Sequence, residues 1–436
     1  MTIPEQALEI FVFGPFTLDT FARALDSHAT AIRVEPPTFE LLEYFVRHAR
    51  ETVTVDEIAE LAGQGERFPE AAVRAQVEVL RATLARYSPR ATFLVDDDGG
   101  YRFVAQVTRR EPASGGGEVA ARRWYARARY FFEKRTADSL HRSIYYYRRA
   151  LEVAPRFGPA HAGLARAYTL SAEYLFIAPH EAYGAALASA QTALALAGPT
   201  LEAYLVLGQV ACSYDRDFEA AEHWYATAKS ADPHGSEPVL FAAWLDVIRG
   251  RADDAARALA VAVEAEPYAT VLQTSLAVTM TFQRRFADAI VRLRAARALD
   301  VGSPHTRLYL AQALCLAGQY DEVVALSSEP CPDGYEQAFL AMRGSALAQR
   351  GDQDQARATA AAMRRLVERG RYVSPYLLSV IALGLGETDE VLALLERSLA
   401  ERDPWIVQAL HHPEFDRLRG EPRFEALLRR IPRPPV

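Results

Sequence analysis

Lysine is almost absent from this 436-residue chain, since Lys134 and Lys229 are the only two. Arginine therefore carries nearly all of the positive charge, and the formal net charge is −7. A chain with this balance has no global basic field that draws it to nucleic acid or to an anionic membrane. Half of its residues are apolar and 24% are charged, which is an ordinary soluble composition.

Cysteines and long apolar runs are also scarce. The chain has three cysteines, Cys212, Cys315 and Cys331, which form neither a CxxC pair nor an even set. We therefore expect neither a disulfide framework nor a thiolate metal site, and we expect the protein to lie in a reducing cytoplasm. No stretch approaches the roughly 18 uninterrupted apolar residues of a membrane span. A secretory signal begins with a basic segment that is followed by an apolar run, and residues 1–14 lack this pattern. The sequence predicts a cytoplasmic protein with no membrane partner.

Two kinds of periodicity follow one another along the chain. Between residues 8 and 107, short apolar runs such as 10–13 and 92–95 indicate strands, and three amphipathic helical patterns lie between them. The second pattern begins at Thr54, which predicts an N-cap with Glu57 as its capping-box partner. Residues 108–120 are rich in Gly, Pro and Ser and predict a flexible linker.

A 34-residue repeat dominates the region from 121 to 404. Small residues recur at this spacing in successive helical patterns, and proline ends the second pattern of two repeats. Two antiparallel helices of about four turns with their connections need roughly 34 residues, which is the tetratricopeptide period. We expect eight repeats, an insertion near 173–180 in the second, a short sixth repeat, and a closing helix pair over 405–436. The recurring residues are Ala243, Ala277 and Ala311, then Ala228, Ala262 and Ala296, with Pro233 and Pro267.

The order of four segments resembles the winged-helix domain of OmpR/PhoB-type response regulators. These are "FGPFTLD", "EPPTFELLEYFVRHARETVTVDEIAEL", "AAVRAQVEVLRATL" and "GGYRF". The rest resembles tetratricopeptide arrays, including the ending "DPWI…PEFDRLRGEPRFEALLRR". The pairing is similar to soluble winged-helix/tetratricopeptide transcription regulators of bacteria. It implies a mainly α fold, with an N-terminal winged helix-turn-helix (α+β) followed by a tetratricopeptide α-solenoid. It also implies a DNA-binding regulator that is not an enzyme and needs no cofactor.

The same resemblance implies a set of DNA-contacting residues. The recognition helix is 69–85, with Arg74, Gln76 and Arg81 as contacts to phosphates or base edges. The start of the second helix, at Thr54, would offer backbone N–H groups to a phosphate. Arg102 would be the arginine of the wing.

The charge of this domain favours an alternative. Residues 8–107 contain ten arginines, no lysine and sixteen carboxylates, a net charge of −6. Asp96, Asp97 and Asp98 stand at the tip of the wing, and Glu78 lies four residues from Arg74, where it is expected to pair with it. The alternative is an interaction scaffold whose acidic winged helix has lost DNA binding and contacts protein. If Arg74, Arg81 and Arg102 form one uninterrupted positive face, DNA binding is favoured.

Residues 109–156 have the opposite balance, with twelve cationic and five anionic side chains. This segment is either a solvated helical surface or an electropositive patch for DNA, RNA polymerase or the acidic domain itself. If the acidic wing docks on it, the chain has an autoinhibited state.

The array is expected to bind a protein partner or a second copy, and a small-molecule effector is possible. Its concave groove is predicted to be lined by Tyr168, Gln209, Asp246 and Gln312, from their positions in the repeats. His411, His412, Glu414 and Asp416 lie close together in sequence, but they flank a proline inside the predicted cap. We therefore expect no metal site there.

Overall fold

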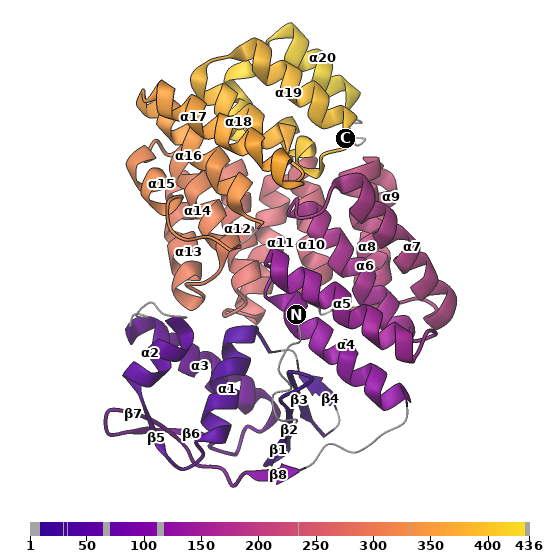
Figure 1. The fold of residues 1–436 in the computed structure, drawn as a ribbon, viewed down its shortest axis with the longest axis vertical. Coiled ribbons are helices and arrows are strands. Elements are labelled where there is room, and N and C mark those ends of the chain that lie inside the picture. Colours follow the sequence, from indigo (N-terminus) through magenta and orange to yellow (C-terminus); the bar gives the residue numbers. More distant parts are fainter. Residues whose placement is uncertain are drawn as a thin grey trace. The chain divides into compact units, whose positions relative to one another are not determined.

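The computed structural model describes residues 9–28, 30–32, 34–63, 70–110, 117–233, 235–332 and 334–431. The chain divides into two compact units. Unit 1 spans residues 1–135, 139–160 and 298–302, and unit 2 spans 136–138, 161–297 and 303–436. Unit 1 therefore combines the N-terminal domain with most of the first helix pair of the array, and unit 2 contains the remaining pairs (Figure 1).

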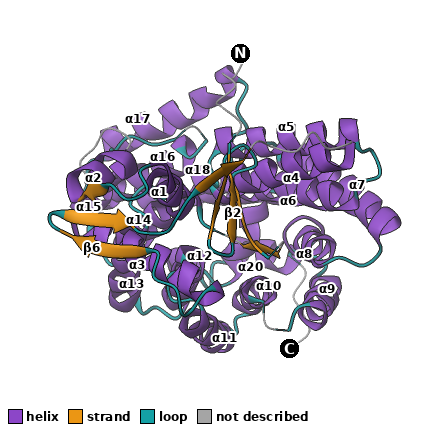
Figure 2. Ribbon diagram, turned by 90° about the horizontal axis from the view of Figure 1, so that it is seen from below, coloured by secondary structure: helices purple, strands orange, loops and turns teal. Residues whose placement is uncertain are grey.

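Two antiparallel sheets frame the N-terminal domain. One has the strand order β4-β3-β2-β1-β8, and the other has the order β5-β7-β6. Figure 2 labels β2 of the first sheet and β6 of the second. Phe13 and Phe16 point inward from their strands and pack against Phe93 and Phe103, with ring centroids 5.2–5.9 Å apart. The strands are β1 (Ile10–Phe13), β2 (Phe16–Asp19), β3 (Ala24–Ser27), β4 (Thr30–Ile32), β5 (Thr52–Thr54), β6 (Leu94–Asp97), β7 (Gly100–Phe103) and β8 (Thr108–Arg110).

Three helices complete the winged helix-turn-helix: α1 (Pro36–Arg47), α2 (Val55–Gly63) and α3 (Glu70–Tyr87). The predicted capping box is present, because the Thr54 N–H donates to the Glu57 carboxylate at 2.7 Å and the Glu57 N–H donates to Thr54 Oγ1 at 3.2 Å. The predicted apolar stripe of α3 is buried. Its members are Val73, Val77, Leu80 and Leu84.

The wing is the hairpin of β6 and β7, and two glycines shape it. Gly99 has a φ of +77°, a left-handed conformation that glycine adopts without steric cost. A Cβ on Gly100 would lie 2.0 Å from the backbone oxygen of Val53 in β5. The sequence "GG" before "YRF" therefore permits both the turn and the close approach of the third strand.

The predicted linker over 108–120 is wrong at both ends. Residues 108–110 form β8, which pairs with β1, and helix α4 already begins at Gly117. Only 111–116 of the predicted linker lie outside the described residues. Glycine and proline content marked a break in the chain, but strand pairing to β1 is a tertiary contact that local composition does not encode.

Within the residues that the structure describes, the array has eight successive helix pairs that coincide with the predicted repeats, although the first pair starts earlier. Residues 174–178 form the expected insertion, and α15 is the short helix of the sixth repeat. The pairs are α4 (Gly117–Glu133) with α5 (Ala137–Val153), α6 (Gly158–Glu173) with α7 (Pro179–Ala197), α8 (Leu201–Gln209) and η1 (Val210–Asp215) with α9 (Phe218–Ala231), α10 (Ser236–Ile248) with α11 (Ala252–Ala265), α12 (Thr270–Phe282) with α13 (Phe286–Leu299), α14 (Pro304–Leu316) with α15 (Tyr320–Leu326), α16 (Glu336–Arg350) with α17 (Gln353–Arg364), and α18 (Pro375–Leu385) with α19 (Thr388–Ala400).

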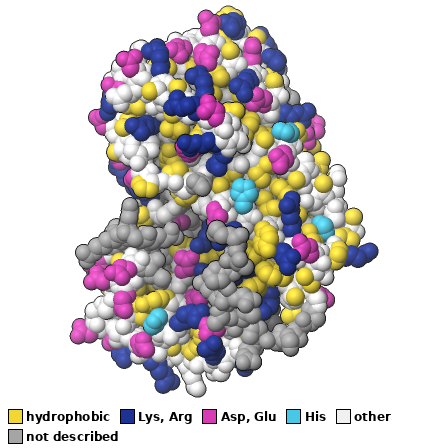
Figure 3. All heavy atoms as spheres, in the orientation of Figure 1, with side chains coloured by type: hydrophobic (Ala, Val, Ile, Leu, Met, Phe, Trp, Pro, Cys, Tyr) yellow, Lys and Arg dark blue, Asp and Glu magenta, His cyan; other side chains and the backbone are white. Residues whose placement is uncertain are grey.

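Small residues lie where the helices cross. The alanines of the 34-residue spacing are all buried, as close helix packing requires. On the face shown in Figure 3, cationic and anionic side chains of unit 2 are interspersed. Arg294 and Glu322, for example, join neighbouring repeats at 2.8 Å. The array surface therefore has mixed charge.

The C-terminal cap differs from the predicted helix pair. It contains two 3₁₀ helices, η3 (Pro404–Leu410) and η4 (Pro413–Leu418), and then helix α20 (Pro422–Arg430). Prolines at the start of each element restrict the backbone and divide the segment into short turns. A short 3₁₀ helix (η2, Arg365–Arg369) also follows α17.

Candidate nucleic-acid interface

Helix α3 and the wing carry two of the predicted contact arginines on one surface. Arg74 and Arg81 are seven residues apart and therefore share a helix face. The Arg81 guanidinium lies 5.6 Å from the ring centroid of Tyr101 in β7. Arg81 therefore lies beside the wing, and Arg74 shares its helix face.

Both arginines are already bound to carboxylates. Arg74 pairs with Glu70 at 2.6 Å, and Arg81 pairs with Glu78 at 2.7 Å and with Asp96 of the wing at 3.1 Å. The expected partner of Arg74 was Glu78, so that prediction is wrong: Arg74 turns toward the start of α3 instead. The hydrogen bond and the charge of Glu70 raise the pKa of Arg74 above its ordinary value.

Arg102 lies on the opposite face of the hairpin from Tyr101, because neighbouring residues of a strand alternate. Its guanidinium pairs with Asp97 at 3.0 Å, and the Thr52 hydroxyl donates to the same carboxylate. The Thr52 hydrogen bond first, and then the charge of Arg102, lower the pKa of Asp97. The three arginines therefore do not form one uninterrupted positive face, which was the expected mark of DNA binding.

The other two predicted contacts are not available in the expected way. Gln76 is buried, with 7% of its surface exposed, and its side-chain amide donates to the Leu299 carbonyl within unit 1. The Thr54 N–H is taken up by Glu57, so it is not a free phosphate donor. Base reading by Gln76 and phosphate binding by the amide of Thr54 both require rearrangement.

A network that the sequence did not predict joins α4 to the N-terminal domain. Arg23 donates to the hydroxyl of Tyr130 at 2.5 Å, and that hydroxyl donates to Glu40 at 2.5 Å. Lys134 binds the same carboxylate at 2.7 Å. Burial alone would raise the pKa of Glu40, but Lys134, Tyr130 and Arg23 more than offset it, so the pKa is lowered.

A second contact strengthens this attachment. Arg123 of α4 pairs with Asp19 at 3.0 Å, and Arg127 donates to the Phe21 carbonyl at 2.6 Å. The hypothesis that the acidic wing docks on the first repeat is therefore wrong for Asp96 and Asp97, which pair inside their own domain. The acidic residues that meet α4 come from β2 and α1. An excess of arginine opposite an excess of carboxylate was the sequence signal for this contact, but it did not identify the partners.

The predicted groove residues of the array are largely occupied. Tyr168, Gln209 and Gln312 are buried, with 4–8% of their surfaces exposed. Asp246 pairs with Arg251, and their closest atoms lie 2.5 Å apart. The chain's own C-terminal segment also contacts the second repeat, because the indole N–H of Trp405 donates to the carbonyl of Glu173 at the end of α6 at 2.8 Å.

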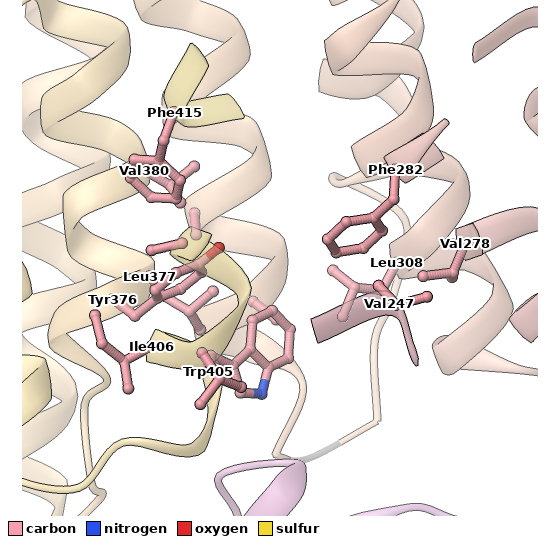
Figure 4. Close-up of a cluster of buried hydrophobic side chains, with 14 of the residues drawn as sticks. Val247, Val278, Phe282, Leu308, Tyr376, Leu377, Val380, Trp405, Ile406 and Phe415 are labelled. Atoms are coloured by element: carbon pink, nitrogen blue, oxygen red, sulfur yellow. The ribbon is translucent and has the colours of Figure 1, made fainter. Parts of the chain in front are cut away.

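This segment, residues 403–419, is called the strap from here on. Figure 4 shows its Trp405 and Ile406 beside Tyr376 and Leu377 of α18. Asp416 forms an ion pair with Arg284 after α12 at 2.7 Å. His412 packs on Phe282, with ring centroids 5.1 Å apart. The strap thus joins the last repeat to the second and fifth.

The acidic and histidine side chains of the strap have structural partners. Asp416 is bound to Arg284, and His412 lies 3.7 Å from Glu414 inside the core. Among the described residues, no group of three or more His, Cys, Asp and Glu is placed to hold a metal ion. Within the same part of the chain, no helix is long and apolar enough to cross a membrane.

No protein-family model matches the chain, and no curated protein matches it. Among the solved structures that are similar to the chain, three are described here. The DNA-binding domain of E. coli CadC is 17% identical, with 23% of this chain and 94% of that domain covered and a TM-score of 0.22. A monomeric IFIT1 mutant bound to m7Gppp-AAAA is 11% identical, with 91% and 94% covered and a TM-score of 0.52. Yeast Tom70 is 14% identical, with 73% and 68% covered and a TM-score of 0.41. Of the three, the IFIT1 superposition alone exceeds 0.5, and it supports the helical-repeat fold.

Proposed function

We propose that this chain is a non-enzymatic transcription regulator of the cytoplasm. Its winged helix binds promoter DNA, and its array binds a regulatory protein or a second copy. The observation that carries the proposal is that the exposed Arg74 and the partly exposed Arg81 share one face of α3, and that Arg81 lies next to the wing. Helix and hairpin in this arrangement suit the major groove and the adjoining backbone.

The carboxylates that hold these arginines act as a brake on DNA binding. Glu70, Glu78 and Asp96 are each more than half exposed. Exposed ion pairs contribute about 0–1 kcal/mol each, so a phosphate or a guanine edge can replace the carboxylate at little cost. The remaining carboxylates still repel the backbone, and the affinity of α3 alone is therefore expected to be low.

Chromatin-immunoprecipitation sequencing tests this function. We expect discrete genomic peaks for the wild-type chain and their loss in the double variant Arg74→Ala/Arg81→Ala. Arg86→Ala is the matched control, since Arg86 is an exposed arginine near the end of α3 that has no role in the proposed contact. A flat profile in cells where the protein is active would overturn the proposal.

A second function is favoured by the separation of Arg102 from the other two arginines. With carboxylates between them, the winged helix presents a mixed and mainly acidic surface that suits a protein partner. Under this alternative, Asp96→Ala/Asp97→Ala/Asp98→Ala leaves DNA binding unchanged and abolishes capture of that partner. Tighter DNA binding by the same variant favours the first function.

A further inference from the structure

A short segment after α13 packs with the N-terminal domain. Residues 298–302 complete α13 and form the turn that leads to α14, yet they belong to unit 1. Within this segment, called the 298–302 turn from here on, Leu299 and Val301 are half-buried and Ala298 is exposed. The side-chain amide of Gln76 in α3 donates to the Leu299 carbonyl. The 298–302 turn therefore lies against the helix that is proposed to enter DNA.

Helix geometry places this contact on one flank of α3. Neighbouring residues of a helix are about 100° apart, so Gln76 and Arg81 lie about 140° apart, one on each side of the buried apolar stripe. Arg81 is on the flank that faces the wing. Gln76 is on the other flank, together with the half-buried Val79 and Thr83. The exposed face of α3 lies between the two flanks.

A helix that enters the major groove is bordered on both flanks by phosphates. The groove is about 12 Å wide, and a helix with its side chains is about 10–12 Å across. When the wing and the flank of Arg81 meet the backbone of one strand, the flank of Gln76 meets the backbone of the other. A chain segment bonded to Gln76 stands where that second backbone would run. The 298–302 turn and a duplex therefore compete for the same flank of α3.

The hydrogen bonding of this contact is incomplete, so it can open. Gln76 is buried, and its Oε1 has no hydrogen-bond partner among the residues that the structure describes. Buried amide oxygens are nearly always bonded, and an unbonded one opposes the burial of its side chain. The Leu299 carbonyl is at the last residue of α13, where carbonyls have no partner within the helix and water can replace Gln76. Release of the turn therefore leaves both groups free to bind water.

We propose that the 298–302 turn is an autoinhibitory contact, which blocks one flank of α3 and must leave it before duplex DNA is bound. The inference rests on the DNA-binding function proposed above and adds its regulation. The blocked state has the turn on Gln76, and the open state has the phosphates of the second strand in its place. Because the turn contacts α3 and not the wing arginines, this block is separate from the carboxylate brake on Arg74 and Arg81.

Distances between spin labels show whether the turn leaves α3 when DNA binds. The full chain carries labels at Ala298 and at Thr30 in β4, both exposed residues of unit 1, with Cys331 replaced by serine. Labels at Thr30 and Arg86, both in the N-terminal domain, are the control pair. The probe is a random-sequence duplex of about 30 base pairs at about 0.05 M salt, where sequence-independent binding is strong. Fluorescence anisotropy measures the bound fraction in the same samples.

We expect a narrow distribution between Thr30 and Ala298 in the free chain, and a longer and broader one at saturating duplex. The distribution between Thr30 and Arg86 should not change. If the distance from Thr30 to Ala298 is also unchanged at saturation, the turn stays on α3 beside bound DNA, and the inference is overturned.

A release variant tests the same contact without labels. Leu299→Ala/Val301→Ala shortens the two half-buried side chains of the turn, and Val261→Ala/Val291→Ala is the control that shortens two exposed ones of α11 and α13. We expect the release variant to bind the duplex about 5-fold more tightly than the wild type, and the control to bind it equally.

The remaining outcomes separate the inference from the function on which it rests. Equal binding by all three proteins overturns the inference and leaves the DNA-binding function standing. If neither the folded wild type nor the folded release variant binds the duplex, the DNA-binding function is wrong and the inference falls with it. If circular dichroism shows that the release variant does not fold, the distance measurement on the labelled chain decides.

Discussion

At the scale of single residues, the wing carboxylates differ in their ion-pair partners. Asp96 binds Arg81, whereas Asp98 is exposed at the turn and holds no arginine in the described structure. We expect Asp96→Ala to tighten DNA binding more than Asp98→Ala, because only the first change also frees a contact arginine. The two changes remove the same charge, so the difference between their salt-dependent affinities isolates the released arginine, at about one unit of salt slope. Equal effects of the two variants would show that the total charge of the wing matters and that no brake exists.

The buried Glu414 gives the strap a defined dependence on pH. Burial raises the pKa of Glu414 from 4.5 to about 7. Below pH 4.5 the Glu414 side chain is protonated in both the folded and the unfolded chain, so its burial does not lower the free energy of unfolding. As the pH rises from 4.5 to 7, the unfolded chain loses its proton first, so stability falls by about 3 kcal/mol in total and stays low above pH 7.

Glu414→Gln removes this penalty, because glutamine stays neutral. We expect the variant to unfold at a higher temperature than the wild type at about pH 8, with no gain at about pH 4. His412 acts in the reverse direction, since burial lowers its pKa to about 3 and its contribution is lost as the pH falls below 6.5. At about pH 8 His412 is neutral in the folded and in the unfolded chain, so the gain measured there reports on Glu414. A constant difference at all pH values would contradict the assignment to Glu414.

Helix periodicity predicts that Arg74 and Arg81 share one face of α3, but it does not predict their ion-pair partners. Their partners depend on rotamers: Glu70 and Glu78 are both four residues from Arg74, and spacing alone does not choose between them. The burial of Gln76 also depends on tertiary packing. Helix periodicity alone places this residue at the edge of the polar face, where it would be expected to be exposed.

At the scale of elements, α4 is the helix that ties the array to the winged helix. The hydroxyl of Tyr130 connects Arg23 with Glu40, and the ring packs on Phe39 with centroids 5.7 Å apart. We expect Tyr130→Phe to lower the free energy of unfolding by about 1–3 kcal/mol, since it removes one hydrogen bond from each of two partly buried charged groups, Arg23 and Glu40. Tyr145→Phe is the control, because that ring is half exposed. Chemical denaturation measures both, and an effect no larger than that of the control would exclude the network.

Element boundaries were predicted well where local signals repeat. The 34-residue spacing, the insertion after α6 and the short α15 were all visible in the sequence, because each repeat packs against near-identical neighbours. The failures lie at elements that depend on distant partners. Strand β8 exists because β1 offers it a pairing edge, and the 3₁₀ helices of the strap exist because repeats two and five hold them. In both cases the partner is distant in sequence, so local composition does not indicate it.

At the scale of the whole molecule, the first helix pair belongs with the winged helix. Glycine and proline content predicted a flexible linker before α4, which would let the N-terminal domain move independently of the array. The structure instead attaches α4 through Asp19, Glu40 and Tyr130 inside one compact unit. Within this unit, α4 is therefore joined to the winged helix through packed side chains and ion pairs.

Distance measurements between spin labels test this rigid attachment. With labels at Arg86 on α3 and His141 on α5, both exposed, we expect a narrow distance distribution. The distribution should not shift between about 0.05 and about 0.5 M salt, because the anchoring contacts are partly buried and weakly screened. Cys331 is replaced by serine beforehand, and the two buried cysteines are retained. Labels at Arg86 and Thr30, both inside the N-terminal domain, give the reference width. If the first distribution is much broader than the reference, or moves with salt, α4 is a detachable element and the ion pairs with Asp19 and Glu40 form a switch that ionic strength can open.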